Sequence, residues 1–146
     1  IVDVQVLNQA GEDVHMLEGG EEVCLNITAH ARTPLEQPIL GFMVRDRLGQ
    51  DLFGENTLAI TDTQPAQEAK AGDFITASFG FRMPMLPNGE YAVTVSIADG
   101  TIDNNIQHEY LHEAMILVVD SDKVRWGLVG IEFREVTLSV SGRISA

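Results

Sequence analysis

Two histidines separated by three residues form a motif of the kind that zinc proteases use. His108, Glu109 and His112 match the His-Glu-x-x-His pattern, in which two imidazoles on one helical face bind zinc and the glutamate acts as a general base. Such a site needs a long amphipathic helix and a further ligand. Here the motif precedes an apolar run at residues 115–119 that is typical of a strand. We therefore interpret the histidines as exposed residues on a strand edge, and we predict no catalytic residue, metal site or cofactor.

An acidic loop and the single tryptophan offer two other kinds of site. The loop carries oxygen-bearing side chains of the type that calcium prefers, but their spacing departs from the EF-hand pattern, so we predict a solvated loop between strands. Its residues are Asp99, Asp103, Asn104 and Asn105. Trp126 has a ring of the kind that stacks on a sugar, or that packs at a sheet edge or dimer contact.

A further candidate surface is formed by the side chains that alternate with the predicted core residues along the strands. These side chains point away from the core. A solvated face in so acidic a chain would usually hold more glutamate and lysine, whereas this one is small and neutral. Two arginines, Arg45 and Arg82, share its parity, and its neutral residues include Asn26, Thr28, Thr94 and Ser96. Such a face suits a neutral or anionic ligand or a second subunit. The alternative is an ordinary outer sheet of mixed polarity.

Hydrophobic alternation with a period of two runs through most of the chain and predicts half-buried antiparallel strands. The alternating segments are residues 2–6, 23–30, 40–45, 75–83, 91–97 and 136–141. Turn residues separate them, and Tyr91, which follows the Pro87-Asn88-Gly89 turn, is predicted to tie its hydroxyl to the backbone. Two segments resist this pattern: residues 62–70 suit a loop or a short helical turn, and residues 105–117 suit a loop that leads into a strand. The pattern predicts an all-β antiparallel sandwich.

Length and charge set limits on the function. The chain has 146 residues, which is about one domain. Nine basic against 22 acidic residues give a net charge of −13, which argues against nucleic acid or an anionic membrane surface as partner. The lone cysteine, Cys24, cannot form an internal disulfide, which favours a reducing compartment. The start in mid-strand, without a methionine, is expected of a fragment cut from a longer polypeptide.

Several short motifs occur in a fixed order. The longest is GFMVRDRLGQDLFGENT at residues 41–57, and the others lie at residues 71–73, 86–91 and 127–129. Together they resemble the C-terminal carbohydrate-binding domain of the ATPase subunit of O-antigen polysaccharide ABC exporters, the Wzt C-terminal family. The resemblance covers essentially the whole chain.

The resemblance implies an immunoglobulin-like β-sandwich that forms a single domain over residues 1–146 and follows an ATP-binding domain. It implies binding of the completed, lipid-linked O-antigen polysaccharide near its capped non-reducing terminus, which couples chain completion to export. The expected location is the cytoplasm, at the inner face of the bacterial inner membrane. The expected partners are a second copy of the chain, with the C-terminal strand at residues 135–144 exchanged, and the transmembrane subunit of the exporter. ATP hydrolysis would belong to the other domain, so no enzyme activity is expected here.

On this basis the outer strand face is predicted to bind the glycan. Arg45 and Arg82 would donate to sugar hydroxyls or to an anionic cap, with Asn26, Thr28, Thr94 and Ser96 as neutral partners. Within the longest motif we expect scaffold roles, with Asn56 and Thr57 in a turn and Asp46 paired with an arginine. Two alternatives stay open: a module that only dimerises the ATPase subunit, and an enzyme that uses His108, Glu109 and His112.

Overall fold

In the computed structural model the chain folds into two β-sheets packed face to face. The structure describes residues 1, 3–60, 67–100, 105–122, 135 and 137–139. The small sheet has the strand order β1-β3-β6, with β1 at Asp3–Leu7, β3 at Glu22–His30 and β6 at Phe74–Arg82. The large sheet has the order β2-β8-β7-β4-β5. Its strands are β2 at Met16–Leu17, β4 at Pro38–Arg45, β5 at Asp51–Asn56, β7 at Gly89–Gly100 and β8 at Asn105–Val119.

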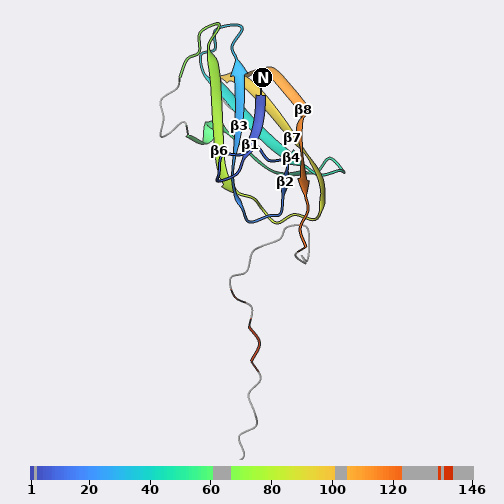
Figure 1. The fold of residues 1–146 in the computed structure, drawn as a ribbon. Coiled ribbons are helices and arrows are strands. Elements are labelled where there is room, and N and C mark those ends of the chain that lie inside the picture. The colour runs from blue at the N-terminus through green and yellow to red at the C-terminus, as the bar shows by residue number, and fades with distance from the viewer. Residues whose placement is uncertain (2, 61–66, 101–104, 123–134, 136, 140–146) are drawn as a thin grey trace, which may run out of the picture.

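The two sheets form separate layers, with β1, β3 and β6 in one and β4, β7 and β8 in the other (Figure 1). All neighbouring strands pair antiparallel except the short β2, which runs parallel to β8. A short 3-10 helix, η1 at Thr57–Ile60, follows β5. The all-β sandwich predicted from the alternation is confirmed. Among the described residues, no helix is long and apolar enough to cross a membrane.

Burial follows the predicted alternation because one face of each sheet is turned toward the other. In β3 every second residue is buried, and the intervening ones are partly or fully exposed. The core draws on both sheets, and its least exposed members include Val6, Leu25, Ile27, Leu40, Val44, Val93, Val95 and Leu117.

An aromatic cluster joins the two sheets. Phe42 on β4 packs against Phe79 and Phe81 on β6, with ring centroids 5.1 and 5.9 Å apart. Phe53 on β5 contacts both Phe42, at 6.2 Å, and Phe81, at 5.6 Å. These edge and stacked contacts are favourable beyond the area that they bury, so they fix which face of β4 and β5 points inward.

The prediction of a loop that leads into a strand at residues 105–117 is wrong. Residues 105–117 belong to one continuous strand, β8, which pairs with β7 along nearly its whole length. The register shifts between Val93 and Val95 and again between Ile97 and Ala98. Each shift inserts extra residues into β8 and breaks the period of two, so apolar residues fall at spacings that imitate a helix. Strands β2 and β5 are also absent from the sequence-based prediction.

The prediction for Tyr91 can be checked in the structure, whereas those for the C-terminal segments cannot. Tyr91 donates its hydroxyl hydrogen bond to the carbonyl of Pro87, so the predicted tie to the backbone is confirmed. The strand expected at residues 136–141, the exchanged segment at residues 135–144 and Trp126 lie largely or wholly outside the described residues, and so does most of the segment at residues 62–70.

The close approach of β5 to β4 at Gly54 yields a stability prediction. A Cβ atom at Gly54 would lie 2.2 Å from the carbonyl oxygen of Phe42 and 3.0 Å from the Cα atom of Met43. Because backbone must move to relieve this overlap, we expect Gly54→Ala to lower the free energy of unfolding by about 2–3 kcal/mol. Urea unfolding measures the change.

The matched control is Gly80→Ala on β6, where nothing lies within 4 Å of the added Cβ atom. This variant should keep the stability of the parent or gain up to about 1 kcal/mol. Equal destabilisation by both substitutions would contradict the steric explanation.

Candidate functional site

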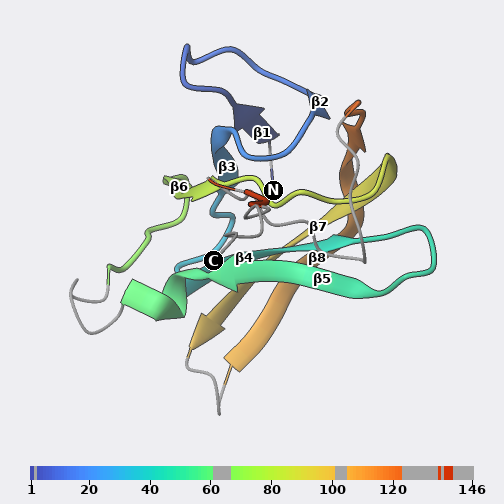
Figure 2. The same cartoon turned by 90° about the horizontal axis from the view of Figure 1, so that it is seen from below.

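A groove with a volume of about 310 Å³ lies on the outer face of the large sheet. The strands that form it, β5, β4, β7 and β8, lie side by side (Figure 2). Residues directly opposite each other in neighbouring strands share one face of a sheet, and the register brings together small and polar residues across all four strands. The lining residues are Gly41, Phe42, Met43, Arg45, Gly54, Glu55, Asn56, Thr94, Val95, Ser96 and Tyr110.

The floor of the groove is largely main chain. Gly41 pairs with Asn56 on one side and with Ser96 on the other, while Met43 pairs with Gly54. A Cβ atom at Gly41 would lie 3.0 Å from the Cβ of Asn56 and 3.2 Å from the carbonyl oxygen of Glu55. The strands therefore need glycine here for their own packing. Gly54 on β5 is exposed, whereas Gly41 on β4 is buried.

Arg45 connects three strands at one end of the groove. Its Nε donates to the carboxylate of Asp51 on β5 over 2.5 Å, and one terminal nitrogen donates to the hydroxyl of Tyr110 on β8 over 2.9 Å. The hydrogen bond from Arg45 to Asp51, and next that to Tyr110, raise the pKa of Arg45 above its ordinary value. The guanidinium is therefore permanently charged and held in place.

Tyr110 is the exposed aromatic residue among the described residues that line the groove, with 40% of its surface accessible. It lies opposite Ser96 on β7, and its ring meets that of His112 edge-on at 4.7 Å between centroids. The hydrogen bond from Arg45 and the ring contact with His112 hold the ring from two sides. Its exposed face is therefore presented to the groove with little freedom to turn.

The six residues predicted to bind a ligand do not form one surface. Arg45, Thr94 and Ser96 line the groove of the large sheet. The other three, Asn26, Thr28 and Arg82, lie on the outer face of the small sheet, on the opposite side of the sandwich. The residues of both outer faces alternate with core residues along their strands, so alternation alone could not show which sheet each residue belongs to.

The small-sheet residues are partly engaged with their neighbours. Arg82 donates to the carboxylate of Glu22 over 3.2 Å, and Asn26 accepts a hydrogen bond from the thiol of Cys24. No groove of the large-sheet kind is associated with them in the described part of the chain. The geometry therefore favours the large sheet as the candidate site.

Thr94 and Ser96 differ although both line the groove. Thr94 is only 2% exposed, and its hydroxyl donates to the carbonyl of His112 over 2.8 Å. This bond spans the bulge in β8, where the ladder is interrupted, so Thr94 supports the strand. Ser96 is half-buried in the middle of the groove, where its hydroxyl can meet a ligand.

The longest sequence motif contributes both to the groove and to the scaffold, and Asn56 and Thr57, predicted in a turn, lie at the end of β5 and the start of η1. The side chain of Asn56 accepts from the amide of Leu58, and the hydroxyl of Thr57 accepts from the amide of Leu40. Asp46 does not pair with an arginine: its carboxylate accepts from the amides of Leu48 and Gln50 and closes the β4–β5 turn. Arg45, one of the two arginines of this motif, pairs with Asp51 instead.

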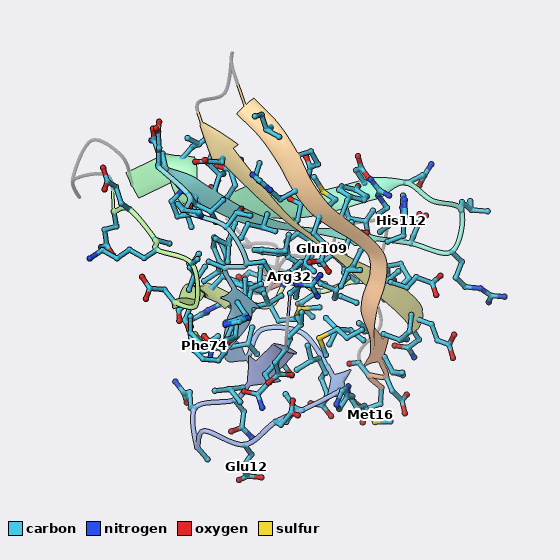
Figure 3. All side chains as sticks on the ribbon, turned by 90° about the horizontal axis from the view of Figure 1, so that it is seen from above. Glu12, Met16, Arg32, Phe74, Glu109 and His112 are labelled. Atoms are coloured by element: carbon cyan, nitrogen blue, oxygen red, sulfur yellow. The ribbon has the colours of Figure 1, made fainter. Side chains whose placement is uncertain are left out.

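The His-Glu-x-x-His motif lies on β8, a strand, without the helix that a zinc protease requires. Figure 3 shows Glu109 and His112 on opposite sides of this strand. In the part of the chain that the structure describes, no three or more residues of metal-binding type come together. Two residues of the predicted acidic loop lie in strands instead: Asp99 in β7 and Asn105 at the start of β8. The carboxylate of Asp99 accepts hydrogen bonds from the backbone amides of Glu36 and Gln37. Asp103 and Asn104 lie outside the described residues.

Sequence reasoning missed Tyr110, Asp51 and Gly54 as parts of one site. Tyr110 sits inside the histidine motif, which drew attention to its neighbours. Its signal was present: an aromatic residue that follows the polar residues 107–109, within a segment long enough to pair with residues 91–97. The bulges concealed its parity.

Comparison with known proteins adds two findings. The family model described as the Wzt C-terminal domain matches residues 1–131. A crystal structure described as the C-terminal domain of Wzt superposes with a TM-score of 0.83 at 16% sequence identity, and the match covers 94% of this chain and 83% of that chain. No curated protein shows significant sequence similarity to the chain.

The different roles of Thr94 and Ser96 can be tested by stability. Thr94→Val keeps the shape of the side chain but removes the donor of its part-buried hydrogen bond to the carbonyl of His112, so we expect a loss of about 1 kcal/mol in the free energy of unfolding. Ser96→Ala is the control and should change it by no more than about 0.5 kcal/mol. Chemical denaturation of both variants gives the comparison, and similar losses would argue against a structural role specific to Thr94.

Proposed function

Because the chain belongs to the Wzt C-terminal domain family, we propose that its groove binds the completed, lipid-linked O-antigen polysaccharide. The family is a non-catalytic domain of the ATPase subunits of O-antigen ABC exporters. A domain in that position can report to the ATPase subunit that a finished polymer is present. Binding near the capped non-reducing terminus would couple chain completion to export.

The arrangement of Tyr110 over a main-chain floor is the observation that supports glycan binding most directly. The C–H face of a sugar ring stacks on an aromatic face, while its hydroxyl groups need donors and acceptors close by. Ser96 and Asn56 supply such groups in the same groove as Tyr110. All of them lie on paired strands, so little order has to be created when the sugar binds.

The proposal extends to the surroundings of the domain. The polymer is anchored to lipid, so recognition would take place at the cytoplasmic face of the inner membrane, where the full-length protein meets the transmembrane subunit. Each hydrogen bond to a sugar replaces one to water and contributes little net free energy. A single groove should therefore bind weakly, and a homodimer that presents two grooves would gain avidity if one polymer, or one membrane surface, spans both.

Co-elution of the purified chain with a panel of capped and uncapped O-polysaccharides tests the proposal. We expect retention of one capped polymer. Tyr110→Ala should weaken that retention by about tenfold, because truncating a central aromatic contact commonly costs more than 1 kcal/mol. Its melting temperature should stay within a few degrees of the parent, since Tyr110 lies on the surface.

Arg82→Ala is the matched control on the opposite face. It removes an arginine that is ion-paired to Glu22, as Arg45 is to Asp51, and it should leave retention unchanged. A loss with Arg82→Ala but not with Tyr110→Ala would move the site to the small sheet. Retention of no polymer, together with a dimer in solution, would favour the alternative, a module that only dimerises the ATPase subunit.

A further inference from the structure

We propose that the chain has a second sugar-binding site, centred on Phe74 on the outer face of the small sheet, an inference that rests on the proposed glycan binding. Its basis is that each outer face of the sandwich carries an exposed aromatic ring with a histidine ring packed against it. Tyr110 and His112 form this pair on the large sheet, and Phe74 and His30 form it on the small sheet. Figure 3 shows Phe74 and His112 on different sides of the molecule.

Phe74 presents an aromatic ring to solvent. It is the first residue of β6, and 69% of its surface is accessible. In the part of the chain that the structure describes, Phe74 and Tyr110 are the two aromatic residues among the exposed large hydrophobic ones. Phe74 lies opposite His30 in the register of β6 and β3, and their ring centroids are 4.8 Å apart. The histidine supports the ring from one side, and an apolar ring held toward solvent suits the C–H face of a sugar.

A hollow with a volume of about 330 Å³ adjoins Phe74 at the edge of the small sheet. Its polar lining consists of the exposed residues Gln67, Glu68, Asp73 and Thr76. The carboxylate of Asp73 accepts a hydrogen bond from the amide of Lys70 over 2.9 Å, which fixes its position. Carboxylates accept hydrogen bonds from hydroxyl groups, and such charge-assisted bonds are stronger than neutral ones. The hollow therefore supplies partners for the hydroxyl groups of a sugar that stacks on Phe74.

The outer face of β3 and β6 continues from Phe74 as a strip of uncharged polar side chains. Thr76 pairs with Thr28, and Ser78 pairs with Asn26. Cross-strand partners share one face of a sheet, so hydroxyl and amide groups follow the aromatic ring in rows about 7 Å apart. Asn26 and Thr28, which the sequence predicted as glycan-binding residues, thus lie on the same face as an exposed aromatic ring. The strip can contact sugars that follow the one on Phe74.

Two sites on opposite faces give a long polymer two points of attachment. The polymer can reach both faces of one molecule or link two molecules, so the second contact adds avidity to a weak first one. A short oligosaccharide lacks this advantage and should bind the two sites independently. Arg82 lies at the other end of β6 from Phe74, so its substitution leaves this second site unchanged.

Amide chemical shifts of the purified chain, followed by NMR spectroscopy, test this proposal. The probe is a short oligosaccharide that carries the capped end of the O-polysaccharide that the chain retains. We expect it to shift two separate groups of amides, one around Tyr110 and Ser96 and one around Phe74 and Thr76. Phe74→Ala should abolish the second group alone and should weaken retention of the full polymer by about threefold or more.

Three further variants show whether the aromatic ring is responsible. Phe74→Leu keeps an apolar side chain against His30 but removes the aromatic face, so it should lose the second group as Phe74→Ala does, whereas Phe74→Tyr should keep it. Met16→Ala is the matched control, because Met16 is 62% exposed on β2, and it should leave both groups and polymer retention as in the parent. All these residues are exposed, so melting temperatures should stay within a few degrees of the parent.

Each outcome bears on a distinct claim. Shifts around Tyr110 alone, or a second group that survives in Phe74→Ala, overturn the second site and leave the proposed groove intact. Conversion of a dimer into a monomer by Phe74→Ala, seen by size-exclusion chromatography, also overturns it, because the ring would then belong to an interface between copies. Shifts around Phe74 alone support the second site and overturn the role of the groove. Retention of no polymer, with no shift on either face, overturns both proposals together.

Discussion

The contact of Phe42 with the aromatic rings of β6 is the interaction on which the rest of the structure depends. It joins the two sheets through Phe79 and Phe81, and it fixes which face of β4 is inside. Because side chains alternate along a strand, an inward Phe42 places Gly41 and Met43 outward, next to Gly54 on β5 and Thr94 on β7. The groove is thus the outer side of the same strands whose inner side forms the core, and its register cannot slip without exposing that core.

Much of the fold could be predicted from the sequence because alternation reports burial directly. The runs at residues 23–30 and 75–83 became β3 and β6 with little change. The method failed where the chain departs from a period of two, and β8 is the clearest case, since its bulges shift the register twice. Strand β5 was missed because its sequence, DLFGEN, sets two apolar residues side by side and follows them with a glycine, so it shows no alternation with a period of two.

The candidate site was less predictable for a related reason. Parity separates inside from outside, but a sandwich has two outer faces, and nothing local to Arg82 or Asn26 says that they lie on the other sheet from Arg45. Only strand order resolves this. The partner of Arg45 could not be predicted either, because Asp46 and Asp51 are both close to it in sequence. In the structure the carboxylate of Asp46 accepts backbone hydrogen bonds within the β4–β5 turn, and Asp51 pairs with Arg45.

A groove floored by main chain also limits how such a domain can diverge. Substitutions change side chains, so a floor built from Gly41 and Gly54 offers nothing to alter without disturbing the packing of β4 on β5. New preferences must then arise on the walls, at positions such as Met43, Ser96 and Tyr110, which project from an unchanged backbone. The architecture thereby separates the part that must be inherited intact from the part that can be retuned by substitution of single side chains.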